Sequence, residues 1–88
     1  MTDRISISST DADLMQAFEV KRREGSGGEI GEINETPHQA AVSTGWKVIR
    51  EIQSGTNWTG TAVLAQDLAG DLWVVSGPGP WAVRVTVS

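Results

Sequence analysis

The chain has 88 residues, which is the size of one domain (1–88), and a net charge of −4 from 11 acidic and 7 basic side chains. It has no cysteine, which excludes disulfides, thiolate metal sites and cysteine catalysis. The negative charge disfavours direct nucleic-acid binding, because phosphates are neutralised by lysine and arginine. The N-terminal sequence lacks the apolar stretch of a signal peptide, and no apolar run approaches the about 20 residues that span a bilayer. We therefore expect a cytoplasmic protein with no membrane contact.

The first expected elements are a short strand and a helix. Alternation of apolar and polar side chains predicts a strand over 5–8. The segment 11–24 carries aspartates in its first turn and the bases 21–23 in its last, which complement the helix dipole, and its apolar residues share one face. A helix is therefore predicted over 11–24, capped by Ser9 or Thr10.

A glycine-rich, acidic segment over 25–35 follows this helix. Its glycines do not have the spacing of a phosphate-binding loop, which also requires a strand before it. Its glutamates stand without a basic residue among them, and we predict a mobile loop that has no packing role and contacts a partner. The candidate contact residues are Glu24, Glu29, Glu32 and Glu35.

The clearest helical pattern begins at Thr36. Thr36 is a suitable N-cap, Pro37 suits the first helical position, and Gln39 completes a capping box. Apolar side chains then recur at helical spacing, with Trp46 and Ile49 among those on the buried face. This pattern predicts one helix over 37–53 that buries its apolar side chains along one face.

A second interpretation of the same stretch stays open. Gly45 in the middle of a helix costs about 1 kcal/mol relative to alanine. The apolar residues of 46–53 also alternate, as they do in a strand. In this alternative the helix ends at Gly45 and a strand follows it.

The C-terminal part is expected to form three strands, over 61–68, 71–76 and 81–88. Ala69-Gly70 marks a hairpin turn between the first two, and the Gly-Pro-Gly-Pro stretch at 77–80 connects the second and third, because proline cannot donate to a ladder. The resulting order, β-α-α-β-β-β, predicts an α+β fold. We expect a two-layer sandwich in which two helices pack on one face of a small, mostly antiparallel sheet.

No residue pattern indicates catalysis or the binding of a metal or cofactor. His38 is the only histidine and is expected to be exposed near a helix start. Ser76 lacks the context of a nucleophile elbow. Asp67 and Asp71 flank the hairpin turn, where aspartate is favoured by turn chemistry. We therefore expect no enzyme activity, no cofactor and no metal site.

Trp58 completes the set of candidate partner-binding residues. It lies in a polar stretch bounded by glycines, where a tryptophan either folds back as a lid on the core or anchors an interface. Both roles stay open for Trp58 at this point.

In size, acidity and lack of catalytic residues the chain is similar to the small phage-encoded inhibitors of host defence, anti-CRISPR proteins among them. The resemblance is one of general profile and assigns no residue roles. It implies a binding protein, monomeric or homodimeric, that acts in the host cytoplasm and blocks a basic, nucleic-acid-handling surface of another protein. The alternatives are a structural or assembly subunit that buries its nearly uncharged C-terminal sheet, and a small enzyme or ligand-binding domain.

Overall fold

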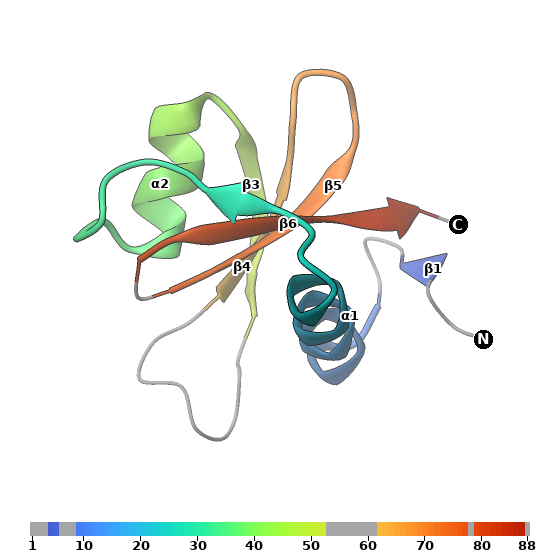
Figure 1. The fold of residues 1–88 in the computed structure, drawn as a ribbon. Coiled ribbons are helices and arrows are strands. Elements are labelled where there is room, and N and C mark those ends of the chain that lie inside the picture. Colours follow the sequence, from blue (N-terminus) through green and yellow to red (C-terminus); the bar gives the residue numbers. More distant parts are fainter. Residues whose placement is uncertain (1–3, 6–8, 53–61, 78, 88) are drawn as a thin grey trace.

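The structure of the protein, a computed structural model, describes residues 4–5, 9–52, 62–77 and 79–87 (Figure 1). Within them the elements follow in the order β1 (Arg4–Ile5), α1 (Asp11–Arg23), β2 (Gly28–Glu29), α2 (Pro37–Thr44), β3 (Lys47–Ile52), β4 (Ala62–Gln66), β5 (Leu72–Ser76) and β6 (Trp81–Val87). The three predicted C-terminal strands are confirmed as β4, β5 and β6. Most of the strand expected over 5–8 lies outside the described residues.

The strands form a sheet in the order β1-β6-β5-β4-β3. The four strands from β3 to β6 are antiparallel neighbours, so that Val63 pairs with Val75 and Val75 with Ala82. β1 runs parallel to the end of β6, and the short β2 pairs antiparallel with its start. The predicted α+β class, with two helices packed on a mostly antiparallel sheet, is confirmed.

The core has two parts, one on each side of the sheet. One part, which we call the α1 face, is formed by Leu14, Met15, Phe18, Ile52, Ala62, Leu64, Leu72, Val74, Val83 and Val85. The other, the α2 face, is formed by Ala41, Val63, Ala65, Val75 and Ala82. Because consecutive strand residues point to opposite sides, the two helices cover opposite faces. The structure thus has three layers, with the sheet between α1 and α2, where the sequence led us to expect both helices on one face.

α1 is the helix that the sequence predicts over 11–24. The side chain of Thr10 caps it by accepting a hydrogen bond from the backbone N–H of Asp13 at 3.2 Å. Its first turn is also tied to β3, because the Arg50 guanidinium pairs with Asp11 and donates to the carbonyl of Ser9. This contact fixes the start of α1 against the edge of the sheet.

The capping box predicted for the second helix is confirmed. The side chain of Thr36 accepts from the backbone N–H of Gln39 at 3.1 Å, and the side chain of Gln39 accepts from the N–H of Thr36 at 3.0 Å. Pro37 occupies the first turn, as expected. Two of the free N–H groups at the start of α2 are therefore satisfied within the chain.

The prediction that this helix continues over 37–53 is wrong. Gly45 adopts φ +96°, a left-handed conformation that favours glycine, and the N–H of Trp46 donates to the carbonyl of Ala41 at 2.9 Å. The chain then enters β3, where pairing with β4 supplies its backbone hydrogen bonds. Trp46 and Ile49 consequently do not share a stripe, since Trp46 packs on the α2 face and Ile49 on the α1 face.

Part of the glycine-rich segment 25–35 has a packing role, which corrects our expectation of a mobile loop without one. Gly28 pairs with Ala82, so the segment lies along the start of β6. A Cβ atom on Gly27 would lie 2.3 Å from the carbonyl oxygen of Ala82 and 2.9 Å from the indole nitrogen of Trp81. Glycine at this position therefore allows β2 to approach β6 closely.

We predict that Gly27→Ala destabilises the fold more than Gly25→Ala. Both glycines have a φ near +90°, so alanine is strained by about 1–2 kcal/mol at either position. Only Gly27→Ala adds a clash with the backbone of β6, because nothing lies within 4 Å of a Cβ on Gly25. Denaturant unfolding of the two variants measures the difference, and equal free energies of unfolding would contradict the close approach.

Candidate functional site

The α2 face is not fully covered by its helix. α2 has 8 residues, about 12 Å of helix, and it packs against β3, β4 and β5. Beside it lies a surface hollow of about 460 Å³ over the β2 and β6 side of the sheet. This tryptophan hollow, as we call it, is lined by the segment 26–30 and by Lys21, Trp46, Trp73, Ala82 and Arg84.

Two stacked indole rings line the tryptophan hollow. The ring centroids of Trp46 and Trp73 are 4.8 Å apart and the ring planes differ by 26°. Trp46 comes directly after the turn at Gly45, and Trp73 lies in β5 opposite the small Ala65 of β4. Both rings remain half-buried, so part of their surface faces solvent.

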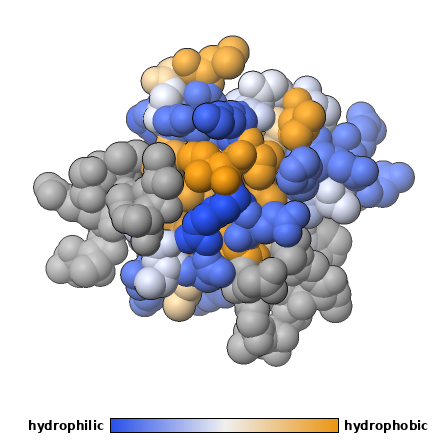
Figure 2. Space-filling view, turned by 180° about the vertical axis from the view of Figure 1, so that it is seen from behind, coloured by the Kyte–Doolittle hydropathy of each residue, from blue (hydrophilic) through white to orange (hydrophobic). Residues whose placement is uncertain are grey.

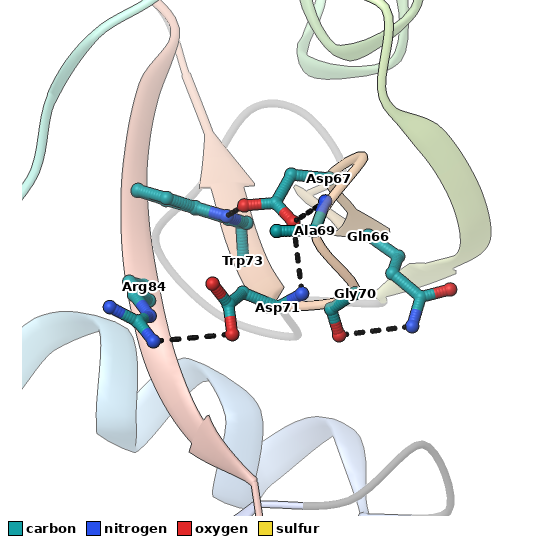
Figure 3. A network of polar contacts seen from close by, with 7 residues as sticks. All are labelled: Gln66, Asp67, Ala69, Gly70, Asp71, Trp73 and Arg84. Atoms are coloured by element: carbon teal, nitrogen blue, oxygen red, sulfur yellow. Dashed lines mark hydrogen bonds and ion pairs between the residues drawn. The ribbon is translucent and has the colours of Figure 1, made fainter.

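An aspartate holds Trp73 in place. The carboxylate of Asp67 accepts hydrogen bonds at 2.9 Å from the indole N–H of Trp73 and from the backbone N–H groups of Ala69 and Asp71 (Figure 3). The hydrogen bond from Trp73, and to a lesser extent those from the backbone, lower the pKa of Asp67 below its ordinary value of 3.8. The residue that sequence analysis assigned to turn chemistry thus closes the hairpin and also orients a ring of the hollow.

Two basic side chains border the rings. Arg84 of β6 is the cross-strand partner of Trp73, and its guanidinium lies 3.2 Å from a carboxylate oxygen of Asp71 (Figure 3). Lys21 reaches the hollow from the last turn of α1. The hollow therefore combines an aromatic floor with cationic groups that come from two different elements.

The glutamates predicted to bind a partner have different surroundings. Glu24 is the C-cap of α1 and Glu29 lies in β2, both exposed. Glu32 is exposed, but Glu35 is half-buried, and its carboxylate accepts from the backbone N–H of Glu32 at 2.7 Å and from the hydroxyl of Ser43. Of this set, only Glu32 and Glu35 are brought together by a contact.

Trp58, the fifth candidate, lies outside the described residues. His38 is exposed on α2. In the part of the chain that the structure describes, no group of three or more His, Asp or Glu side chains is placed to hold a metal ion. None of the described helices has the length and apolar character needed to cross a membrane.

No family model matches the sequence, and neither a curated protein nor a solved structure gives a match. The interpretation of the hollow therefore depends on its geometry.

Sequence analysis missed the residues that form the tryptophan hollow. Trp46 was assigned to a helix stripe, and Trp73, Lys21 and Arg84 were not considered as binding residues. One indication was present in the sequence: the alternative in which the helix ends at Gly45 makes 46–53 a strand and places Trp46 at its start. The register that joins Trp46 to Trp73 involves three strands and is not visible in a local pattern.

We predict that Asp67→Asn lowers the melting temperature and that this difference depends on pH. The folded state lowers the pKa of Asp67, so the carboxylate stabilises the fold above pH 3.8, and this contribution is lost as the pH falls through the lower pKa of the folded state. Near-UV circular dichroism melts between about pH 7 and pH 2.5 should show the two proteins converging below pH 3.8. Glu19→Gln, an exposed change on α1, controls for the loss of one charge. A difference that is constant with pH would contradict this role of the carboxylate.

Proposed function

We propose that the chain is a non-enzymatic binding protein that contacts another protein through the tryptophan hollow. The observation that carries this proposal is the stacked pair of Trp46 and Trp73, which stays half-buried on an uncovered part of the sheet. Apolar surface left in water costs about 25 cal/mol per Å², so covering the rings with a partner is favourable. Tryptophan and arginine are also the residues most enriched among those that dominate binding energies in interfaces.

The chemical groups of the hollow favour binding over catalysis. Its aromatic rings provide contact area, and Lys21 and Arg84 provide hydrogen-bond donors. Group transfer would require a nucleophile hydrogen-bonded to a general base, and the hydroxyl of Ser26 in the lining makes no such bond to Lys21 or Glu29 among the described residues. What this arrangement supports is recognition of a partner.

The acidic segment offers a second surface and supports a more specific form of the proposal. The exposed Glu29 and Glu32, together with the net charge of −4, favour a partner with a basic surface. In this form the protein is an inhibitor of the phage type that blocks a nucleic-acid-handling surface of its partner. Glu35 contributes less, because its carboxylate is already bound to Ser43.

The alternative of an assembly subunit is less well supported. Most of the described apolar side chains of β4, β5 and β6 are buried within the chain, whereas Trp73 and Trp81 are half-buried. The edge strand β3 has an irregularity between Val48 and Arg50 and carries charged residues, features that discourage pairing with another edge. Figure 2 shows that the hydrophobic surface of the back of the molecule is broken up by hydrophilic side chains.

The proposal is tested by blocking the hollow with a side chain. Gly28 pairs with Ala82, so a side chain at 28 lies on the α2 face, and nothing lies within 4 Å of a Cβ there. Wild type, Gly28→Phe and the control Gln16→Phe, which adds the same ring to an exposed position of α1, serve as baits for affinity capture from source cells. We expect a partner that wild type and Gln16→Phe retain and that Gly28→Phe loses.

Retention of the same proteins by all three baits would contradict the role of the hollow. Circular dichroism melts confirm that the baits are folded. A loss with both phenylalanine variants would point to the added ring itself and would likewise count against the hollow.

The more specific form predicts a salt effect. Glu29→Gln with Glu32→Gln should slow association with the captured partner about two- to tenfold at low salt and flatten its salt dependence, because exposed charges act mainly on encounter. Glu35 is left unchanged, since it has a structural role. Stopped-flow or surface-plasmon rates measure the effect, and unchanged rates at low salt would exclude the acidic segment from the contact.

A further inference from the structure

We infer that the segment bound by the tryptophan hollow carries a carboxylate next to an apolar side chain; this rests on the proposed function and adds the chemistry of the ligand. Such a segment is an Asp or Glu beside an aliphatic or aromatic residue on the surface of the partner. The inference follows from which groups of the hollow are free to interact and which are already bound.

The donors of the hollow are largely free. The Arg84 side chain is 64% exposed and its guanidinium contacts one oxygen of Asp71, which leaves most of its five N–H donors unused. Lys21 is half-buried, and no carboxylate in the described part of the chain forms an ion pair with it. A carboxylate forms short, charge-assisted hydrogen bonds with both arginine and lysine.

The acceptors near the hollow are directed away from it or already bound. Glu29 lines the hollow, but it pairs with Trp81 in the strand register, and that register places its side chain on the α1 face. Asp67 is bound to Trp73 and to two backbone N–H groups, and Asp71 is paired with Arg84. Among the residues that line the hollow, Lys21 and Arg84 are cationic and only Glu29 is anionic, so the lining has an excess of hydrogen-bond donors, although the anionic Asp67 and Asp71 lie beside it.

The floor of the hollow requires an apolar group beside the carboxylate. Ile30 and Ala82 extend the apolar surface of the stacked tryptophans. A carboxylate alone would leave this surface in water, and an apolar group alone would give no acceptor to Lys21 or to the Arg84 donors that Asp71 does not use. A cationic ligand would find the faces of the rings but would be repelled by Lys21 and Arg84.

Three capped hexapeptides test the inference, each with a Leu-Phe centre flanked on both sides by Asp, by Asn or by Lys. Binding is followed through the indole N–H signals of Trp46 and Trp73 in heteronuclear NMR spectra. We expect the Asp peptide to bind about tenfold more tightly than the Asn peptide, as two partly exposed charge-assisted hydrogen bonds allow, and the Lys peptide to bind most weakly. Added salt should reduce this preference.

Paired variants identify the source of the preference. Lys21→Gln with Arg84→Gln should bring the affinities of the Asp and Asn peptides within about twofold of each other. Arg23→Gln with Lys47→Gln changes the net charge equally at exposed positions outside the hollow and should leave the preference intact.

The outcomes separate this inference from the proposed function. If the Asn or Lys peptide binds as tightly as the Asp peptide, and Gly28→Phe abolishes that binding, the inference is overturned and the hollow remains a binding site. If no peptide shifts the two indole signals, the proposed function fails as well. If the signals shift with protein concentration alone, the occupant is a second copy of the chain, and the inference is overturned.

Discussion

The left-handed backbone at Gly45 determines how much of the sheet is covered. It ends α2 after 8 residues and lets the chain turn directly into β3. The helix therefore shields the α2 face above β3, β4 and β5, while the neighbouring surface at β6 stays open. The same turn delivers Trp46 to the position where it stacks on Trp73. The turn at Gly45 thus determines both where the edge strand β3 begins and how much of the tryptophan surface α2 leaves exposed.

The described tryptophans have different surroundings on the two faces of the sheet. Trp81 packs against the α1 face, where the Arg22 guanidinium lies 4.8 Å from its ring centroid and the carbonyl of Ser26 accepts from its indole N–H. Trp46 and Trp73 lie on the opposite face beyond the end of α2 and keep part of their rings in solvent. All three rings are half-buried, so they differ in their contacts: Trp81 is held by Arg22 and Ser26, whereas Trp46 and Trp73 stack on each other and line the hollow.

Local signals predicted the parts of the fold that local interactions determine. The cap and charges of α1, the capping box of α2 and the aspartates of the hairpin turn act over three or four residues, and these predictions are confirmed. The end of α2 could not be decided in this way, because the apolar residues after Gly45 fit both a helix and a strand. Pairing with β4, distant in sequence, made the choice. The hollow depends on that pairing, so its residues were missed.

The position of β6 in the sheet has a consequence for the order of folding. β6 is the last described strand to leave the ribosome, yet it pairs with β5, β2 and β1, and the pair of Arg4 and Thr86 joins the two ends of the described chain. Until β6 is present, Leu72 and Val74 pair with β4 on one side only, and the other edge of β5 has no neighbouring strand. Contacts between residues so far apart in sequence slow folding, because a long loop must close before they form. Nascent chains that end before β6 would expose the edge of β5 and would therefore be prone to aggregate or to need a chaperone.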